Sequence, residues 1–504
     1  QTILRKLSSQ QNSKIDGIEE LFADKDNQTL LKYWDALMLP AAKCPLVFYQ
    51  LDLENLGQSD DLYVKMNGRG KPLSDFENFK ADLIKYIADQ EWTSLLHAQN
   101  GLPILLDTKW LDFFWKYRNS NISLDDMMFG FINRFLLVRL MMAQTPQKIE
   151  DREMGDSPID NAFKYLYSFT EKKDARASYN MTGFGVYQTV FEELGAYSVL
   201  YDLRTLLENL RVFDRDKLTS CVSYPYEDGK EKFEVIYTSG KNDYYILTIP
   251  ETIAFWAVCQ FFLSPSVYCT EHCTEDRLRQ WMRVVWNVCN YQVLENSKIL
   301  NEIRSKTQLR STIISLHKAF PYKWDVHNVK WFVSPEEGDT DKTSLHIVEE
   351  QAKIRQFQNG VYYDKQKALQ GQTWETIICF LEKLPFFRGT IRALFTDGSG
   401  KINWSSFDTK YEHLYWYLNS YGDLNSIAHR NLLLYHYDFA SWFWYPRGDR
   451  RNATWRSKLP YYPSPVHEWL MAEPLNHDEL STCIVQEPSY AKRCLIQTAL
   501  MQEV

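Results

Sequence analysis

The sequence predicts a mainly α-helical protein with a small α+β part near its N-terminus. Apolar residues recur at three- and four-residue spacing through nearly every segment outside residues 45–53 and 219–250, and this periodicity is typical of amphipathic helices. Those two exceptions carry short aromatic and β-branched runs, which favour strands. A chain of 504 residues with 45% hydrophobic residues can bury more than one core. We therefore expect two or three domains in which helix exceeds strand at least about threefold.

The α+β part is predicted from the first elements of the chain. Helical spacing predicts helices over Ile15–Phe22 and Thr29–Leu39. The apolar run Pro45–Leu53 predicts a buried strand, and the residues Asn67-Gly-Arg-Gly-Lys-Pro72 predict a tight turn after it.

A well-marked helix start follows this turn. Ser74 is a predicted N-cap, and Glu77 stands three residues later, where it would complete a capping box. The apolar face predicted for the helix consists of Phe76, Phe79, Leu83, Ile84 and Ile87.

Further helices and one hairpin are predicted along the rest of the chain. The hairpin pairs Phe233–Tyr237 with Tyr244–Thr248 across a turn-compatible loop. The acidic stretch 333–343, which contains Gly and Pro, is a predicted boundary loop, and beyond residue 440 the periodicity is weak. The predicted helices are Leu124–Met142, Pro158–Thr170, Gly185–Leu210, Glu251–Leu263, Asp276–Leu300, Ile347–Phe357 and Trp374–Leu384.

Composition limits the classes of function. A net charge of −8 is unlike that of a protein that coats nucleic acid, so any such contact must be a local patch. The 31 Tyr, 28 Phe and 16 Trp residues favour aromatic packing between helices over base stacking.

The cysteines indicate a reducing compartment. Nine cysteines are scattered along the chain without dense spacing, which argues against a secreted disulfide scaffold. Cys269, His272 and Cys273 form the one tight Cys/His group, but no second ligand pair stands at the spacing of a zinc site. We therefore predict reduced, mostly buried thiols and no metal site of this kind.

No segment predicts a membrane span or a signal peptide. The most apolar run, Phe129–Ala143, contains Arg134 and Arg139, and Thr252–Leu263 is shorter than a span. We expect a cytoplasmic protein with no membrane partner, in which Thr252–Leu263 is a buried helix.

The turn before Ser74 has the chemistry of an anion site. Gly68 and Gly70 allow a close backbone approach, and Asn67 can stabilise the turn through its side chain. Arg69 and Lys71 place two cations beside a helix N-terminus, which favours a phosphate. In the alternative reading, Arg69 pairs with a carboxylate and the glycines only form a turn.

These residues belong to Asp61–Lys80, which resembles the Asn-x-Arg-Gly-x-x-Leu-(Ser/Thr) element of the GmrSD restriction endonuclease N-terminal domain family. That bacterial family is related to the ParB/sulfiredoxin-like nucleotidases. Residues 278–287, 374–389 and 430–434 resemble its long, bacteroidal-type branch, so the resemblance covers about residues 10–460.

The resemblance implies a remnant of a ParB/sulfiredoxin-like domain followed by a large helical body with an inserted β-hairpin. The implied domains are residues 1–90, the C-terminal part of a ParB-like domain; 91–335, helical with the hairpin near 230–250; and 345–504, helical and rich in aromatic residues.

One departure from the family concerns its phosphate-binding Asp-Gly-Gln-Gln-Arg element. Gln10-Gln11 has no Asp-Gly before it and no Arg after it. Either the element precedes Gln1, which the non-Met start favours, or the chain is a degenerate member. NTPase activity is expected only in the first case.

The nuclease that accompanies such domains carries a His-x-x-Pro element. His346 and His429 have no Pro at that spacing, so both are interpreted as structural histidines and no nuclease is predicted within the chain.

A second candidate surface lies in residues 442–458, where cations alternate with aromatic side chains. Phosphate contacts and base stacking would use Arg447, Arg450, Arg451, Trp455 and Arg456. The alternative is a surface loop that its tryptophans anchor to the helical body.

Two functions are carried forward from the sequence. The resemblance implies a nucleotide-dependent component of a restriction or phage-defence system that acts on or senses nucleic acid. Its implied cofactors are a nucleoside triphosphate and Mg²⁺, and its implied partners are DNA and a separate nuclease subunit. The alternative is a non-catalytic nucleic-acid- or protein-binding scaffold with a degenerate nucleotidase domain.

Overall fold

In the computed structural model, helix accounts for most of the part of the chain that the structure describes. Extended residues pair there only in two isolated bridges, Val361 with Thr373 and Thr396 with Ile402. The prediction of a mainly α protein is confirmed. The described residues are 73–96, 101–118, 123–143, 157–168, 183–226, 233–236, 249–263, 275–295, 304–320, 344–361, 372–384 and 389–421, with a few single positions and residues 470–474.

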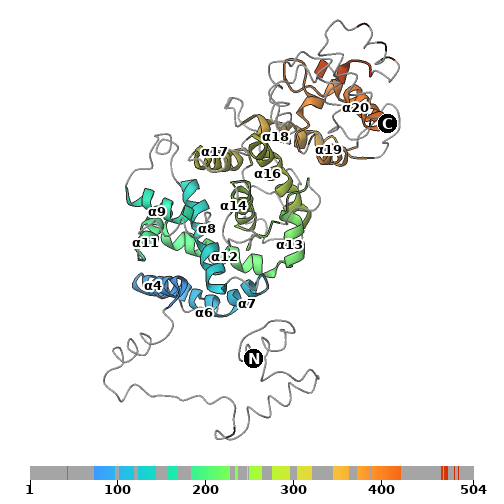
Figure 1. Cartoon of the computed structure of the whole chain (residues 1–504). Helices are drawn as coiled ribbons and strands as arrows, with labels where there is room; N and C mark the ends of the chain where they lie inside the picture. The colour runs from blue at the N-terminus through green and yellow to red at the C-terminus, as the bar shows by residue number, and fades with distance from the viewer. Residues whose placement is uncertain are drawn as a thin grey trace, which may run out of the picture.

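The predicted strand 45–53, most of the predicted hairpin 233–248 and most of the predicted ParB-like part, residues 1–90, lie outside these residues; the helix over Asp75–Asp89 at the end of that part is described. Elements carry the labels of Figure 1. The helices before the C-terminal lobe are α4 (Asp75–Asp89), α5 (Thr93–Leu96), α6 (Leu102–Asp107), α7 (Lys109–Trp115), α8 (Leu124–Ala143), α9 (Pro158–Tyr167), α11 (Gly185–Leu194), α12 (Ala196–Val212), α13 (Arg215–Val222), α14 (Ile249–Leu263), α16 (Glu275–Glu295), α17 (Arg304–Ala319) and α18 (Ser344–Phe357). The C-terminal lobe, as we call residues 372–421, contains α19 (Trp374–Lys383), η4 (Arg392–Phe395), η5 (Trp404–Ser406) and α20 (Phe407–Tyr421).

Helices α4 to α17 share one hydrophobic core, and we call them the helical body. Helix α14 is buried around almost its whole circumference, as expected for the apolar run Thr252–Leu263. Aromatic rings fill much of this core; for example, the ring centroids of Phe79 and Tyr187 lie 4.5 Å apart, and those of Phe131 and Phe255 lie 5.4 Å apart. Many of the aromatic residues therefore serve packing.

The C-terminal lobe has a second, smaller core. It contains Leu381 of α19, Phe395 of η4 and Leu414 of α20, all fully buried. Trp404 stacks on Phe395 with ring centroids 4.4 Å apart and covers one side of this core.

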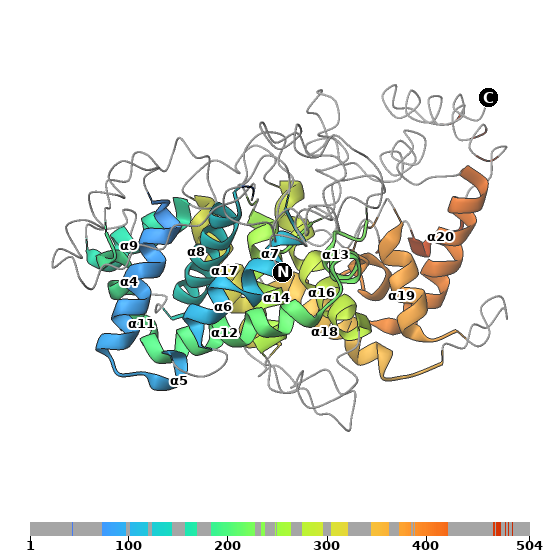
Figure 2. The same ribbon diagram turned by 90° about the horizontal axis from the view of Figure 1, so that it is seen from below.

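Helix α18 joins the two cores. Its Ile347 and Ile354 belong to the core of the body, whereas its Ala352 belongs to the core of the lobe. It packs against α16 and α17 on one side and against α19 on the other. Figure 1 shows the lobe, in orange, set apart from the body and connected to it near α16 and α18, and Figure 2 shows the same order along the long direction of the molecule.

Helix α4 begins as the sequence predicts. The Ser74 hydroxyl accepts a hydrogen bond from the Glu77 amide at 3.2 Å, and the Ser74 amide donates to Glu77 Oε2 at 2.8 Å. Of the predicted apolar face, Phe76, Phe79, Leu83 and Ile87 are buried, and Ile84 is half-buried.

The structure differs from the prediction over residues 185–210. Two helices, α11 and α12, replace the single predicted one, because Gly195 adopts a φ of +76° between them. A positive φ cannot continue a right-handed helix, and glycine adopts it at little cost. Helices α5, α6, α7, α13, α17 and α20 were not predicted.

Candidate functional site

The candidate site is built on a stripe of polar residues along α18. His346, Glu349, Glu350 and Lys353 are spaced by three or four residues and therefore share one face of the helix. All four are buried, with exposed fractions of 4%, 2%, 1% and 0%. A helix face of this kind requires partners, because a buried charge without one is strongly destabilising.

Lys353 is the centre of the cluster. Its Nζ lies 2.6 Å from Glu350 Oε1, 2.9 Å from Glu349 Oε1 and 3.1 Å from Glu382 Oε1. It also donates to the Gly389 carbonyl at 2.6 Å. The Lys353 ammonium therefore links Glu349 and Glu350 of α18 to α19 and to the Gly389 carbonyl in the lobe.

Helix α16 contributes the second cation from the body. Arg283 Nη1 lies 2.6 Å from Glu382 Oε1 and 3.3 Å from Glu350 Oε2. One turn later, Asn287 Nδ2 donates to Glu350 Oε1 and to Glu382 Oε1, at 2.9 Å in both cases. The guanidinium carbon of Arg283 lies 5.2 Å from the ring centroid of Phe357, which covers it.

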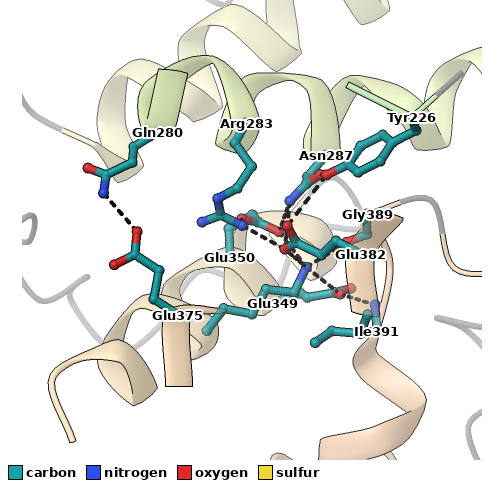
Figure 3. Close-up of polar contacts among 11 residues, drawn as sticks. Tyr226, Gln280, Arg283, Asn287, Glu349, Glu350, Glu375, Glu382, Gly389 and Ile391 are labelled. Carbon is teal, nitrogen blue, oxygen red and sulfur yellow. Dashed lines mark hydrogen bonds and ion pairs between the residues drawn. The ribbon is translucent and has the colours of Figure 1, made fainter. Parts of the chain in front are cut away.

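Two further contacts enclose the cluster, as Figure 3 shows. The Tyr226 hydroxyl donates to Asn287 Oδ1, and the Ile391 amide donates to Glu349 Oε1 at 2.7 Å. Outside this enclosed set, Gln280 Nε2 donates to Glu375 Oε1 at 2.7 Å and joins α16 to α19 a second time. We call Arg283, Glu349, Glu350, Lys353 and Glu382 the junction cluster.

The junction cluster contains three carboxylates and two cations. The surroundings raise the pKa of one carboxylate, Glu350, and lower the pKa of another, Glu382. Burial raises the pKa of Glu350 to about 7, against the pull of Lys353 and Arg283. Burial also acts to raise the pKa of Glu382, but Arg283 and Lys353 outweigh it and hold that pKa below its usual value. Burial, reinforced by Lys353 and Arg392, lowers the pKa of His346 to about 3, so this imidazole is neutral near pH 7.

These contacts suit proton storage and charge compensation inside the protein. Three buried polar atoms of the cluster accept or donate no hydrogen bond within the described residues, namely Arg283 Nε, Glu349 Oε2 and Glu350 Oε2. No group of three or more His, Cys, Asp or Glu side chains in the described part is arranged to hold a metal ion. A proton gained or lost by one of its carboxylates would therefore change the net charge of the cluster.

The predicted phosphate site, Asn67, Gly68, Arg69, Gly70 and Lys71, lies outside the described residues. What the structure describes is the end of α4 that follows it. There the Ser74 hydroxyl donates to Asp125 Oδ2 of α8 at 2.8 Å, and the first turn of α4 carries Asp75 and Glu77. This end of α4 is therefore held firmly against α8 and is acidic.

The other predicted site residues, Arg447, Arg450, Arg451, Trp455 and Arg456, lie outside the described residues too, and so does His429. His346 is described, and its burial in α18 agrees with the structural role predicted for it. The described cysteines Cys221, Cys259, Cys289 and Cys379 form no disulfide, and the first three are buried.

Sequence reasoning did not identify the junction cluster, although it singled out two of its segments. Arg283 and Asn287 lie in residues 278–287, and Glu382 and Gly389 lie in residues 374–389, both of which contribute to the family resemblance. The structure brings these two segments together around α18. The spacing His-x-x-Glu-Glu-x-x-Lys, placed on a helix that also carries Ile347 and Ile354, was the available signal.

No protein-family model matches the chain, and no curated protein or solved structure matches it either. The resemblance at residues 61–80 therefore stays a prediction from the sequence. None of the helices in the described part combines the length with the apolar surface that crossing a bilayer requires.

Proposed function

We propose that this protein is a nucleotide-dependent component of a restriction or phage-defence system. The observation that supports this most is that residues 67–71 directly precede α4 in the sequence. The segment resembles the family's Asn-x-Arg-Gly element, and it leads directly into a helix whose first turn is fixed by a capping box.

The fixed helix end makes a phosphate site at Arg69 and Lys71 physically reasonable. Lys71 precedes Ser74 by three residues, and three peptide units span at most about 11 Å. Phe76 and Phe79 anchor the start of α4 against Phe129, with ring centroids 6.2 Å and 5.4 Å apart. A binding loop gains precision from such a rigid support.

The acidic surroundings of this helix end favour a cation together with the nucleotide. Asp75 is exposed and Asp125 is half-buried, and Mg²⁺ sites shared with phosphates commonly use one or two protein carboxylates. In this proposal the carboxylates of Asp75 and Asp125 would contact a Mg²⁺ ion that neutralises phosphate charge, and Asp125 Oδ2 already accepts a hydrogen bond from Ser74. Arg69 would contact phosphate as a planar fork and Lys71 as a point charge.

A specific observation favours the alternative, a non-catalytic scaffold. The capping box already occupies the amides of Ser74 and Glu77, and Asp75 and Glu77 repel an anion at this end of the helix. In the scaffold, the nucleic-acid or protein contact would fall to residues 442–458, including Arg450 and Arg456.

Calorimetric titration with nucleoside triphosphates and Mg²⁺ decides between the two. Arg69→Ala should weaken binding roughly 10- to 150-fold, because a charge-assisted contact contributes about 1.5–3 kcal/mol. Lys85→Ala is the matched control: it removes one positive charge from the exposed side of α4 and should change affinity less than about twofold. Absence of binding by the unmodified protein, or equal affinities for Arg69→Ala and the control, would support the scaffold.

A further inference from the structure

The junction cluster lies where the two cores of the molecule meet. Its charged side chains come from α16 of the body, from α18 and from α19 of the lobe, and each is at most 12% exposed. With every group ionised, the three carboxylates exceed the two cations by one charge. An uncompensated charge in such a place destabilises the contact that encloses it.

Glu350 is the group best placed to remove the excess charge. Its Oε1 accepts hydrogen bonds from Lys353 and Asn287, whereas its Oε2 accepts none within the described residues and has only the longer ion-pair contact with Arg283 Nη1 at 3.3 Å, so a proton on Oε2 breaks no hydrogen bond. Burial supports the same choice, since it raises the pKa of Glu350 to about 7.

Helix α18 packs against α16, α17 and α19. The groups that act on Glu350 are Lys353 and Glu349 of α18, Arg283 of α16 and Glu382 of α19. Glu350 in turn acts on Tyr226 and on Cys379 of α19, and Arg392 of η4 acts on His346 of α18. On α17, Arg310 donates to the Met141 carbonyl of α8, His317 is affected by Arg139 of α8, and Lys318 is exposed. Burial raises the pKa values of Cys379, to about 12, and of Tyr226, so the thiol and the phenol stay neutral near pH 7.

We propose that the junction cluster is a proton-dependent latch: with Glu350 protonated the C-terminal lobe stays docked on the body, and with Glu350 ionised this contact loosens. The inference concerns the joint between the two parts and does not depend on the proposed nucleotide function. Figure 3 shows how the side chains of α16, α18 and α19 converge on one another at this joint.

The pH window follows from two opposed titrations. Because the pKa of Glu350 is raised from 4.5 to about 7, its stabilising contribution is lost as the pH rises through about 7. Because the pKa of His346 is lowered from 6.5 to about 3, its contribution is lost as the pH falls below 6.5. The two effects cancel between about pH 4.5 and pH 6.5, so the net loss that Glu350 causes should emerge above pH 6.5 and level off above about pH 7, where Glu350 is ionised in both states.

Hydrogen–deuterium exchange of the full chain between about pH 6 and pH 8 tests the latch. After correction for the intrinsic exchange rate, protection of α19 and η4 should fall as the pH rises from about 6.5 to about 7 and then level off, by at most ~10-fold per pH unit for one proton, while protection of α12 stays constant. Glu350→Gln should remove this pH dependence, because Gln cannot ionise. Glu375→Gln, which alters the outer contact between α16 and α19, should keep it.

Protection of α19 that does not change with pH, or a pH dependence that persists in Glu350→Gln, would overturn the latch. If Glu350→Gln fails to fold, the unmodified protein still tests the latch in two ways. Exchange in peptides from α19 is compared with exchange in peptides from α12, and infrared difference spectra are recorded over the same pH range. A loss of protection shared equally by α12 and α19, or the lack of a protonated-carboxyl band that disappears as the pH rises, would contradict the proposal. A loss confined to the lobe, together with that band, would support it.

Discussion

At the scale of single residues, Gly389 is the point where the backbone shapes the junction cluster. It has a φ of +93°, and its carbonyl accepts a hydrogen bond from Lys353. A Cβ at this position would lie 2.5 Å from Asn287 Oδ1 and 3.2 Å from Tyr226 Cε2. The close packing of the hydrogen-bonded pair Tyr226 and Asn287 therefore requires a residue without a side chain.

We expect Gly389→Ala to lower the free energy of unfolding of the lobe by more than about 2 kcal/mol, since backbone strain of about 1–3 kcal/mol is joined by displacement of Asn287. Gly183→Ala separates the two causes. Gly183 has a φ of +107°, but a Cβ added there would meet no atom within 4 Å, so only backbone strain applies. Urea denaturation of both variants measures the difference, and equal losses would mean that the contact with Asn287 contributes nothing.

The residues of the junction cluster were visible in the sequence, but their meeting was not. Arg283 and Glu382 stand 99 residues apart, and no local rule pairs them. The buried charged stripe on α18 resembles a solvent-exposed helix face when only residue types are considered. Its burial depends on two cores that pack against opposite sides of the same helix, and spacing alone does not predict that arrangement.

At the scale of elements, α4 illustrates what local sequence determines well. The capping box and apolar face of this helix depend on residues within a few positions of one another, and both were predicted. The break between α11 and α12 depends on the conformation of one residue, Gly195, and glycine also occurs inside helices. Sequence periodicity continues across this break and therefore did not reveal it.

Ser74→Ala should destabilise the protein more than Ser157→Ala does. The Ser74 hydroxyl accepts a hydrogen bond from the Glu77 amide and donates one to Asp125 Oδ2. Its loss therefore removes both the helix cap and a link between α4 and α8. Loss of a capping Ser costs about 0.5–2 kcal/mol, and we expect the upper half of that range here. Ser157 caps α9 from an exposed position, through the Asp160 amide. Thermal unfolding of the two variants gives the comparison, and a smaller loss for Ser74→Ala would show that the bond to Asp125 adds no stability.

At the scale of the whole molecule, the composition predicted that aromatic rings fill the cores, but it did not predict how the chain divides into a body and a lobe. The high aromatic content indicated ring packing, and rings do fill both described cores. The division of that packing between a large body and a small lobe follows from contacts between distant segments. A polar junction between two apolar cores couples them less than a shared core would, because its charges have lost their hydration in order to meet.

This architecture leads us to expect two thermal transitions, the first for the lobe and the second for the body, since a smaller core buries less apolar surface per residue. A matched pair of core truncations assigns them. Leu381 of the lobe is 0% exposed and Leu203 of the body is 1% exposed, so Leu→Ala should cost about 2–5 kcal/mol at either position. In calorimetry, Leu381→Ala should lower only the first transition and Leu203→Ala only the second. If both variants instead lowered one common transition, body and lobe would unfold as a single cooperative unit, and the charged contacts of α18 would transmit stability as effectively as a continuous hydrophobic core.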